Sequence, residues 1–108
     1  ADVVISAVPS TESSNKIFSN NLFEKMKNGV IFINISRGKI VDTDALLKHL
    51  KKDKFLGVGL DVTHPEPLDM YHDLRKDVRV IITPHIGGMT LQGQLRAWNF
   101  AVNKFKDI

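Results

Sequence analysis

The chain has 108 residues, of which 43% are hydrophobic and 25% charged, and it carries a formal net charge of +3 at pH 7. This length allows one compact domain, and this composition is typical of a globular protein rather than a disordered, collagen-like or coiled-coil one. The basic residues are interspersed with acidic ones, which argues against a nucleic-acid-binding surface, and the absence of cysteine excludes disulfide frameworks, thiolate catalysis and cysteine-based zinc sites.

Four short apolar runs, rich in valine and isoleucine, predict β-strands. They cover residues 3–8, 30–35, 56–62 and 78–83. Each run is continuous rather than alternating, which is typical of strands that are buried on both faces of a parallel sheet.

Helical patterns connect these runs. The first is expected to begin after Ser19 and to end at Gly29, and the second to begin after Asp42, because serine and aspartate cap helix N-termini and glycine ends helices. Their apolar faces carry Leu22, Phe23 and Met26 in the first and Ala45, Leu46 and Leu50 in the second. The third connection, residues 67–74, has room for a brief helix only. The order βαβαβαβ predicts an open α/β sheet with right-handed crossovers.

The segment from residue 90 to the end predicts one long helix. Its apolar residues follow spacings of four, three, four and three: Leu91, Leu95, Trp98, Val102 and Phe105. This pattern places one apolar stripe along the helix.

The two ends of the chain lie close to predicted elements. Ala1 is followed at once by a strand-like run, and Ile108 falls inside the helical pattern. We therefore expect a fragment of a longer polypeptide. No apolar run approaches the about 20 residues of a membrane span, so we expect no membrane partner. The absence of cysteine permits a cytoplasmic location, which is the location we expect.

Chemistry-bearing side chains follow three of the predicted strands. Arg37 follows the second strand, Asp61 and Glu66 follow the third, and His85 follows the fourth. In open parallel sheets, ligands bind beyond the carboxyl ends of the strands. The sequence therefore places a guanidinium, two carboxylates and an imidazole at the edge where such a fold binds its ligand.

This combination suits a redox site for 2-hydroxy or 2-oxo acids. Histidine exchanges protons near neutral pH, and a neighbouring carboxylate stabilises its protonated form. Arginine binds a substrate carboxylate through a planar, two-point fork. The hydride carrier is the missing component, and a doubly wound sheet commonly binds a nicotinamide cofactor.

Other chemistries fit less well. A metal site would draw on His64, Glu66, His72 and His85. Their spacing matches no zinc-site pattern. A serine nucleophile at Ser36 lacks the G-x-S-x-G turn of the hydrolases, and the polar residues 10–14 lack the lysine of a phosphate-binding P-loop.

Five segments, in chain order, together resemble the NAD-binding domain of the D-isomer-specific 2-hydroxyacid dehydrogenases. They are Ala1-Asp2-Val3-Val4 through Val8-Pro9, Asn34-Ile35-Ser36-Arg37-Gly38-Lys39-Ile40-Val41-Asp42, Gly59-Leu60-Asp61-Val62, Glu66-Pro67 and Pro84-His85-Ile86-Gly87-Gly88. The resemblance covers almost the entire chain.

The resemblance implies catalytic roles for three residues and a cofactor site. Arg37 resembles the arginine that binds the substrate carboxylate, His85 the acid/base, and Glu66 its carboxylate partner. Implied cofactor contacts are Val8, Pro9, Ile35, Ser36, the Arg37 backbone, Asp61, His85, Gly87 and Gly88. Asp61 matches the acid at the nicotinamide end, and the two glycines match a segment that lets the main chain approach the nicotinamide.

The glycine fingerprint of dinucleotide-binding folds, G-x-G-x-x-G, is not in the sequence. Gly57-Val58-Gly59 lies inside a predicted strand, and Val62 stands where the last glycine is required. The resemblance therefore implies the second half of a Rossmann domain over residues 1–108, with residues 90–108 as a long C-terminal helix that returns to a substrate domain. Both the fingerprint and the substrate domain are expected outside this chain, and the fragment is expected to be inactive alone.

The resemblance implies an NAD(P)-dependent oxidoreductase that acts on a D-2-hydroxy or 2-oxo acid, with NAD as the expected cofactor, NADP left open, and a homodimer as the expected assembly. Two alternatives remain: a non-catalytic, corepressor-like partner-binding protein on the same scaffold, and a flavodoxin-like or receiver-like domain complete at this length. The run 3–8 would form an exposed apolar edge. We expect it to pair with another copy, or the Trp98 stripe to cover neighbouring apolar surface.

Overall fold

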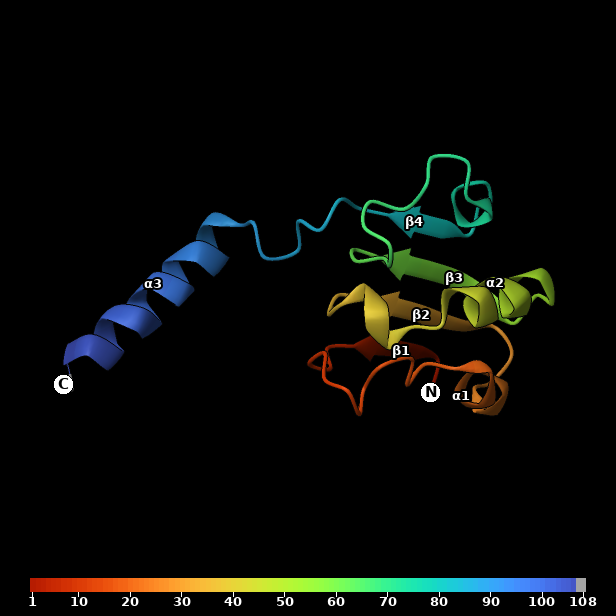
Figure 1. Ribbon diagram of the computed structural model, residues 1–108, viewed down its shortest axis with the longest axis horizontal. Coiled ribbons are helices and arrows are strands. Elements are labelled where there is room, and N and C mark those ends of the chain that lie inside the picture. Colours follow the sequence, from red (N-terminus) through yellow and green to blue (C-terminus); the bar gives the residue numbers. More distant parts are fainter. Residues whose placement is uncertain (107–108) are drawn as a thin grey trace.

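The computed structural model describes residues 1–106. Four strands and their connecting helices form one compact body, and a long helix extends from it (Figure 1). The elements, in chain order, are β1 (Val3–Ser6), α1 (Asn20–Lys25), β2 (Val30–Asn34), the short 3-10 helix η1 (Gly38–Ile40), α2 (Thr43–Lys51), β3 (Phe55–Leu60), the short 3-10 helix η2 (Asp73–Arg75), β4 (Val80–Ile82) and α3 (Leu91–Lys106).

The sheet is parallel, and its strand order is β1-β2-β3-β4. The register pairs Ser6 with Asn34, Asn34 with Leu60, and Leu60 with Ile82, so all four strands end at one common edge. The α/β class and the sheet of four parallel strands with flanking helices are confirmed. The loops that carry the predicted site residues therefore leave the sheet side by side.

The strands are shorter than the apolar runs that predicted them. β1 ends at Ser6, and β4 covers only Val80–Ile82. Val62 is nevertheless buried beyond its strand and Val8 packs against the core, whereas Val78 is exposed in the turn before β4. Apolar character predicts burial, but strand pairing also requires a neighbouring backbone within hydrogen-bond reach.

The helices begin where the sequence predicts and end differently. Asp42 caps α2, because its Oδ1 accepts a hydrogen bond from Ala45 N at 3.1 Å. Ser19 occupies the cap position of α1 without a side-chain bond, and that helix ends well before Gly29, which adopts a φ of 80° in the turn before β2. The third connection forms only η2.

The core lies between one face of the sheet and the helices α1 and α2. Phe23 of α1 packs edge-on against Phe32 of β2 and Phe55 of β3, with ring centroids 5.5 and 5.4 Å apart. Leu46 and Leu50 of α2 are buried in the same cluster. The connecting helices thus cover this face.

The opposite face of the sheet is open, so the prediction that the strands are buried on both faces is wrong. Ile5 of β1 is 57% exposed and Ile81 of β4 is 69% exposed. The strand order never reverses within this chain, and right-handed crossovers that always advance in one direction place their connections on one face. Helices on both faces require a reversal of the strand order.

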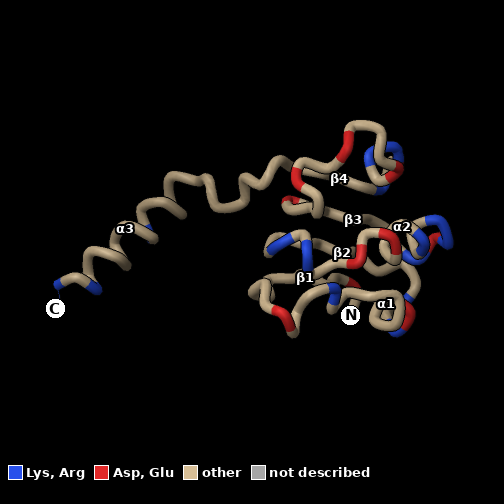
Figure 2. The backbone as a smooth tube through the Cα atoms, viewed as in Figure 1, with Lys and Arg blue, Asp and Glu red and all other residues tan. Residues whose placement is uncertain are grey.

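Helix α3 points away from the sheet (Figure 1) and buries no residue. Its apolar stripe, including Trp98, is exposed and covers no other part of the described chain. The expected pairing of the strand edge with another copy, or cover of neighbouring apolar surface by the stripe, stays a prediction. The last two residues of the helix predicted over 90–108 lie outside the described residues. Figure 2 shows basic and acidic residues mixed around the sheet, whereas the charged residues of α3 are all basic. Within residues 1–106, no helix is both long and apolar enough to cross a membrane.

Candidate functional site

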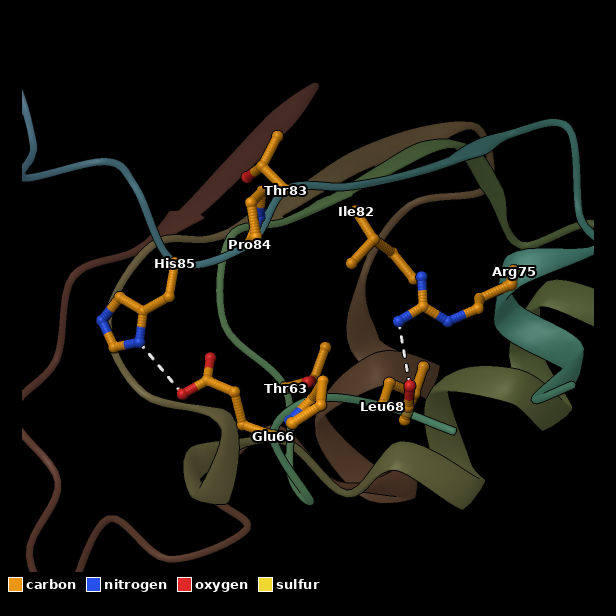
Figure 3. Close-up of a pocket in the computed structure, with 9 residues that line it drawn as sticks. Thr63, Glu66, Leu68, Arg75, Ile82, Thr83, Pro84 and His85 are labelled. Carbon is orange, nitrogen blue, oxygen red and sulfur yellow. Dashed lines mark hydrogen bonds and ion pairs between the residues drawn. The ribbon is translucent and has the colours of Figure 1, made fainter. Parts of the chain in front are cut away.

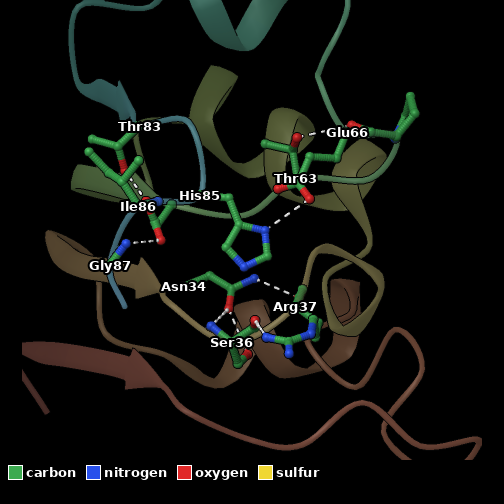
Figure 4. Close-up of polar contacts among 11 residues, drawn as sticks. Asn34, Ser36, Arg37, Thr63, Glu66, Thr83, His85, Ile86 and Gly87 are labelled. Carbon is green, nitrogen blue, oxygen red and sulfur yellow. Dashed lines mark hydrogen bonds and ion pairs between the residues drawn. The ribbon is translucent and has the colours of Figure 1, made fainter. Parts of the chain in front are cut away.

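The predicted site residues lie at the carboxyl edge of the sheet. Arg37 follows β2, Asp61 and Glu66 follow β3, and His85 follows β4. Figure 4 shows these loops gathered at one end of the strands. Strands that are neighbours in the sheet thus bring together residues that are far apart in the sequence.

His85 and Glu66 form a direct pair. His85 Nδ1 lies 3.0 Å from Glu66 Oε2, and the two side chains are 42% and 43% exposed. An ionised carboxylate only accepts hydrogen bonds, so Nδ1 carries the proton and Nε2 is left on the free side of the ring. His85 also has a φ of 58°, a left-handed conformation that is uncommon outside glycine. Such backbone conformations persist only where the surrounding structure holds them.

Asp61 holds the segment on either side of His85. Its Oδ1 accepts hydrogen bonds from Thr83 Oγ1 at 2.6 Å and Ile86 N at 2.9 Å, and its Oδ2 accepts one from Gly87 N at 2.8 Å. The Thr83 hydroxyl, followed by the two backbone N–H groups, lowers the pKa of Asp61. Asp61 is therefore an ionised, nearly buried carboxylate that connects β3 to the loop after β4.

Gly87 lies close to the Asp61 carboxylate, where a side chain would displace Oδ2. A Cβ atom at position 87 would lie 2.9 Å from Asp61 Oδ2. The neighbouring Gly88 has open space around it, so no atom of the described chain requires a glycine there.

Asn34, at the end of β2, organises the loop that carries Arg37. Its buried Oδ1 accepts hydrogen bonds from Ser36 N at 3.1 Å and Ser36 Oγ at 2.8 Å, and its Nδ2 donates to Arg37 O at 3.0 Å. The Ser36 Oγ also lies 3.2 Å from Ser6 Oγ. The sequence motif contains Asn34 but does not predict this role; its one signal is a polar residue at the end of an apolar strand.

The Arg37 side chain does not reach the His85–Glu66 pair. Its Nη1 donates to the carbonyl of Ser36 at 2.7 Å, and within residues 1–106 it makes no hydrogen bond or ion pair with Glu66 or His85. The backbone brings the loops together instead, because a Cβ at Gly38 would lie 2.0 Å from the Thr63 carbonyl oxygen. The loop after β2 therefore packs directly on the loop after β3.

Two hollows open at this edge. Most of the predicted residues line one or the other, whereas Asp61, Gly87 and Gly88 line neither. One, of about 400 Å³, is lined by Ala7, Val8, Pro9, Ser10, Ile35, Ser36 and Arg37. The other, of about 460 Å³, is lined by Thr63, Glu66, Pro67, Leu68, Arg75, Ile82, Thr83, Pro84 and His85 (Figure 3). The first hollow contains the residues implied to contact a cofactor at the ends of β1 and β2, and the second contains the proton-exchanging pair.

The first hollow fits part of a dinucleotide. Val8, Pro9 and Ile35 provide an apolar wall, and the hydrogen bonds of Asn34 hold the turn at Ser36 in place. Such apolar walls with a few fixed polar groups are typical of cofactor sites.

The alternative chemistries find no support in this geometry. Among the described residues, no three histidine, aspartate or glutamate side chains are grouped closely enough to hold a metal ion. The Ser36 hydroxyl donates to the amide oxygen of Asn34, which is not a base. In the polar stretch 10–14, Ser14 Oγ donates to Pro9 O at 2.7 Å and accepts from Thr11 N at 2.7 Å, so these groups satisfy one another.

Comparison with known proteins identifies relatives along most of the chain. The family described as D-isomer specific 2-hydroxyacid dehydrogenase, NAD binding domain, matches residues 1–87. Human glyoxylate reductase/hydroxypyruvate reductase is 40% identical over 83% of this chain and 27% of its own length. Glyoxylate reductase from Pyrococcus horikoshii is 44% identical over 81% of this chain and 26% of its own length.

Solved structures agree with this assignment. Phosphoglycerate dehydrogenase from Lactobacillus plantarum has a TM-score of 0.81 and 37% identity, covering 98% of this chain and 34% of its own. D-lactate dehydrogenase from Aquifex aeolicus, solved with NAD and lactic acid, has a TM-score of 0.79 and 33% identity, covering 98% of this chain and 36% of its own. The chain thus spans about a quarter to a third of the relatives it matches. It belongs to the D-isomer specific 2-hydroxyacid dehydrogenases, as part of their NAD-binding domain.

Proposed function

We propose that this chain is part of an NAD(P)-dependent oxidoreductase that interconverts D-2-hydroxy acids and 2-oxo acids, and that it corresponds to the second half of the nucleotide-binding domain. The observation that carries the proposal is the His85–Glu66 pair, at 3.0 Å, beside the loop of Arg37 at the carboxyl edge of the sheet. This reaction needs a group that exchanges a proton, here His85, and a group that binds a carboxylate, here Arg37, at one ligand-binding edge.

His85 would exchange the proton. Its Nδ1 is held by Glu66, and within the described part of the chain no hydrogen bond involves Nε2. Nε2 is therefore the atom that would donate a proton to the carbonyl oxygen of a 2-oxo acid, or remove it from the hydroxyl in the reverse direction. Glu66 would stabilise the imidazolium that precedes the donation.

Arg37 would bind the substrate carboxylate. The side chain is exposed and held by one hydrogen bond to Ser36 O. Rotation of the side chain would exchange this single bond for a two-point interaction with a carboxylate. Replacement by lysine would weaken that binding, because a single charged ammonium replaces the planar guanidinium that binds a carboxylate at two points.

Val8, Pro9, Ile35 and Ser36 would line the cofactor, which when bound would supply or accept the hydride. Asp61 Oδ2 accepts one hydrogen bond from within the chain, and a carboxylate oxygen has capacity for a second, such as the amide N–H of a nicotinamide. NAD is the proposed cofactor. One related structure contains NAD and another NADPH. The contacts of Gly88, a homodimeric assembly and a cytoplasmic location stay predictions from the sequence.

The test is an assay of the full-length protein. NADH and NADPH oxidation would be followed with glyoxylate, hydroxypyruvate, pyruvate and larger 2-oxo acids. His85→Ala is expected to lower kcat by about 10²–10⁴-fold, the usual contribution of a general acid. His64→Ala is the matched control, because His64 is exposed on the neighbouring loop and makes no side-chain hydrogen bond within residues 1–106.

A wild-type protein that oxidises neither cofactor with any of these acids would contradict the proposal and would favour a partner-binding protein on the same scaffold. Equal losses in His85→Ala and His64→Ala would contradict the role assigned to His85.

A further inference from the structure

The Glu66 side chain is held in place by few contacts other than the one with His85, the residue that it orients. Within residues 1–106, its carboxylate has one hydrogen-bond partner, His85, and 43% of the side chain is exposed. A carboxylate at the end of three rotatable bonds samples many positions, and more of them when its backbone is also free to move. The position of the pair therefore depends on what fixes the segment that follows Glu66.

Arg75 binds that segment at two consecutive carbonyl groups. Its Nη2 donates to Leu68 O at 2.9 Å, and its Nε donates to Asp69 O at 3.0 Å. Arg75 ends η2, and its guanidinium crosses back to the segment 66–69, on the opposite side of the hollow from His85 (Figure 3). A guanidinium provides this two-point geometry, and an ammonium does not.

The burial of Leu68 does not make this contact redundant. The Leu68 side chain is buried in the core and fixes where the segment lies. Apolar packing is not directional, however, whereas two hydrogen bonds fix how the peptide planes of Leu68 and Asp69 are turned. Glu66 lies two residues before Leu68, with Pro67 between them. These planes therefore limit the backbone conformations from which the Glu66 side chain extends.

We propose that Arg75 is a positioning residue for the Glu66–His85 pair: by holding the carbonyls of Leu68 and Asp69, it directs the Glu66 carboxylate to His85 Nδ1 and so keeps Nε2 available for proton transfer. Arg75 touches neither substrate nor cofactor in this role. The structural part stands on the contacts alone, and only the kinetic consequence rests on the proposed function.

The first test measures the ring of His85 in the full-length protein. ¹⁵N chemical shifts of the labelled imidazole distinguish a proton on Nδ1 from one on Nε2, with the signal assigned by its loss in His85→Gln. In the wild type, the neutral ring is expected to carry its proton on Nδ1. In Arg75→Ala, a mixture of the two forms is expected, as in Glu66→Gln. An unchanged Nδ1-protonated ring in Arg75→Ala would overturn the proposal.

The second test measures coupling between Arg75 and Glu66 by a double-mutant cycle. Arg75→Ala is expected to lower kcat about tenfold, because a misplaced catalytic group is costly, with the KM for the 2-oxo acid changed by less than about twofold. In the Glu66→Gln background, the same substitution is expected to have no further effect on kcat. If the two substitutions lower kcat by independent factors that multiply in the double variant, Arg75 does not act through Glu66.

Two further variants separate positioning from folding. Lys76→Ala is the matched control, because Lys76 is the next residue and binds Asp73 rather than the segment after Glu66. This variant should change neither the protonation of the His85 ring nor kcat. If Arg75→Ala does not fold, Arg75→Lys decides. A lysine keeps the positive charge but lacks the planar guanidinium that binds both carbonyls, so it should give a smaller change of the same kind. If the wild type turns over no 2-oxo acid, the proposed function fails, and the ring measurement still decides the role of Arg75.

Discussion

At the scale of single residues, two buried polar side chains organise the carboxyl edge. Asp61 receives three hydrogen bonds from the segment around His85, and Asn34 makes three with its own loop. The partners of Asp61 lie 22 to 26 residues away in the sequence. Asp61 therefore ties two strands of the sheet together in addition to its proposed contact with a cofactor.

Asp61→Asn is expected to destabilise the fold. An asparagine keeps one acceptor oxygen and faces at least one of the backbone N–H groups of Ile86 and Gly87 with its own NH₂. Loss of a charged acceptor for a buried donor costs about 1.5–3 kcal/mol, measurable by urea unfolding at pH 7. The control is Glu12→Gln, an exposed carboxylate without a hydrogen bond inside the described residues. Equal stability of the two variants would mean that the hydrogen bonds of Asp61 add little to the stability of the fold.

At the scale of elements, local sequence signals and tertiary contacts decide different features. Asp42 and Ser19 both precede a helix, and the sequence alone predicts a cap at each. Only Asp42 makes the cap hydrogen bond, to Ala45 N at 3.1 Å, while the Ser19 side chain makes none. The residue type permits the cap, and the side-chain rotamer in the folded chain decides whether it forms.

The two caps provide a matched pair of substitutions. Asp42→Ala is expected to lower the free energy of unfolding by about 1 kcal/mol, because it leaves the Ala45 N–H at the start of α2 without its acceptor. Ser19→Ala is expected to change it by less than about 0.5 kcal/mol. Thermal and urea unfolding of the two variants measure the difference, and a larger loss in Ser19→Ala would contradict the observed geometry.

Arg79 connects the turn before β4 to the end of α2. It binds Asp77 at 2.7 Å, Asp53 at 2.9 Å and the carbonyl of Leu50 at 2.8 Å. The hydrogen bonds and charge of Arg79 lower the pKa of Asp77 to about 2. Because the folded pKa lies below the unfolded one, the stabilising contribution of Asp77 is complete above about pH 4 and is lost as the pH falls through the folded value.

Asp77→Asn is therefore expected to lower the free energy of unfolding at pH 7 by about 1–2 kcal/mol. The difference from the wild type should narrow as the pH falls from about 4 towards the folded pKa. Urea unfolding at a series of pH values measures both effects. Asp53→Asn is the control, because the Asp53 side chain is 89% exposed and its ion pair should contribute less to the free energy of unfolding. A pH-independent difference would show that the charge of Asp77 is not the cause.

At the scale of the whole molecule, the chain has one covered face and one open one. Ile5 and Ile81 lie on the open face of the sheet, β1 forms one of its edges, and α3 stands apart with its apolar stripe exposed. Exposed apolar surface of this kind and an unpaired strand edge favour association.

The chain by itself is expected to associate with further copies. Introducing charge on the open face, with Ile5→Glu and Ile81→Glu combined, should shift sedimentation towards the monomer. Val78→Glu is the control, since Val78 is 98% exposed in a turn and away from the strands. A wild-type chain that sediments as a monomer at high concentration would contradict this expectation.

The sequence by itself determined the order of the elements, the four strands of a parallel sheet, and the edge whose loops carry Arg37, Asp61, Glu66 and His85. Apolar runs, helix caps and the right-handed crossover act locally or by general rule. The family motifs added the pairing of His85 with Glu66, which the structure places in contact.

Only the tertiary structure decided the rest. It shows which face of the sheet is open, that Arg37 folds back on its own loop, and that Arg75 holds the segment after Glu66. These features depend on the rotamers and directions of side chains whose partners come from other segments of the chain. A hydrophobic pattern indicates that a residue is buried or exposed, but it does not specify which atom is its partner.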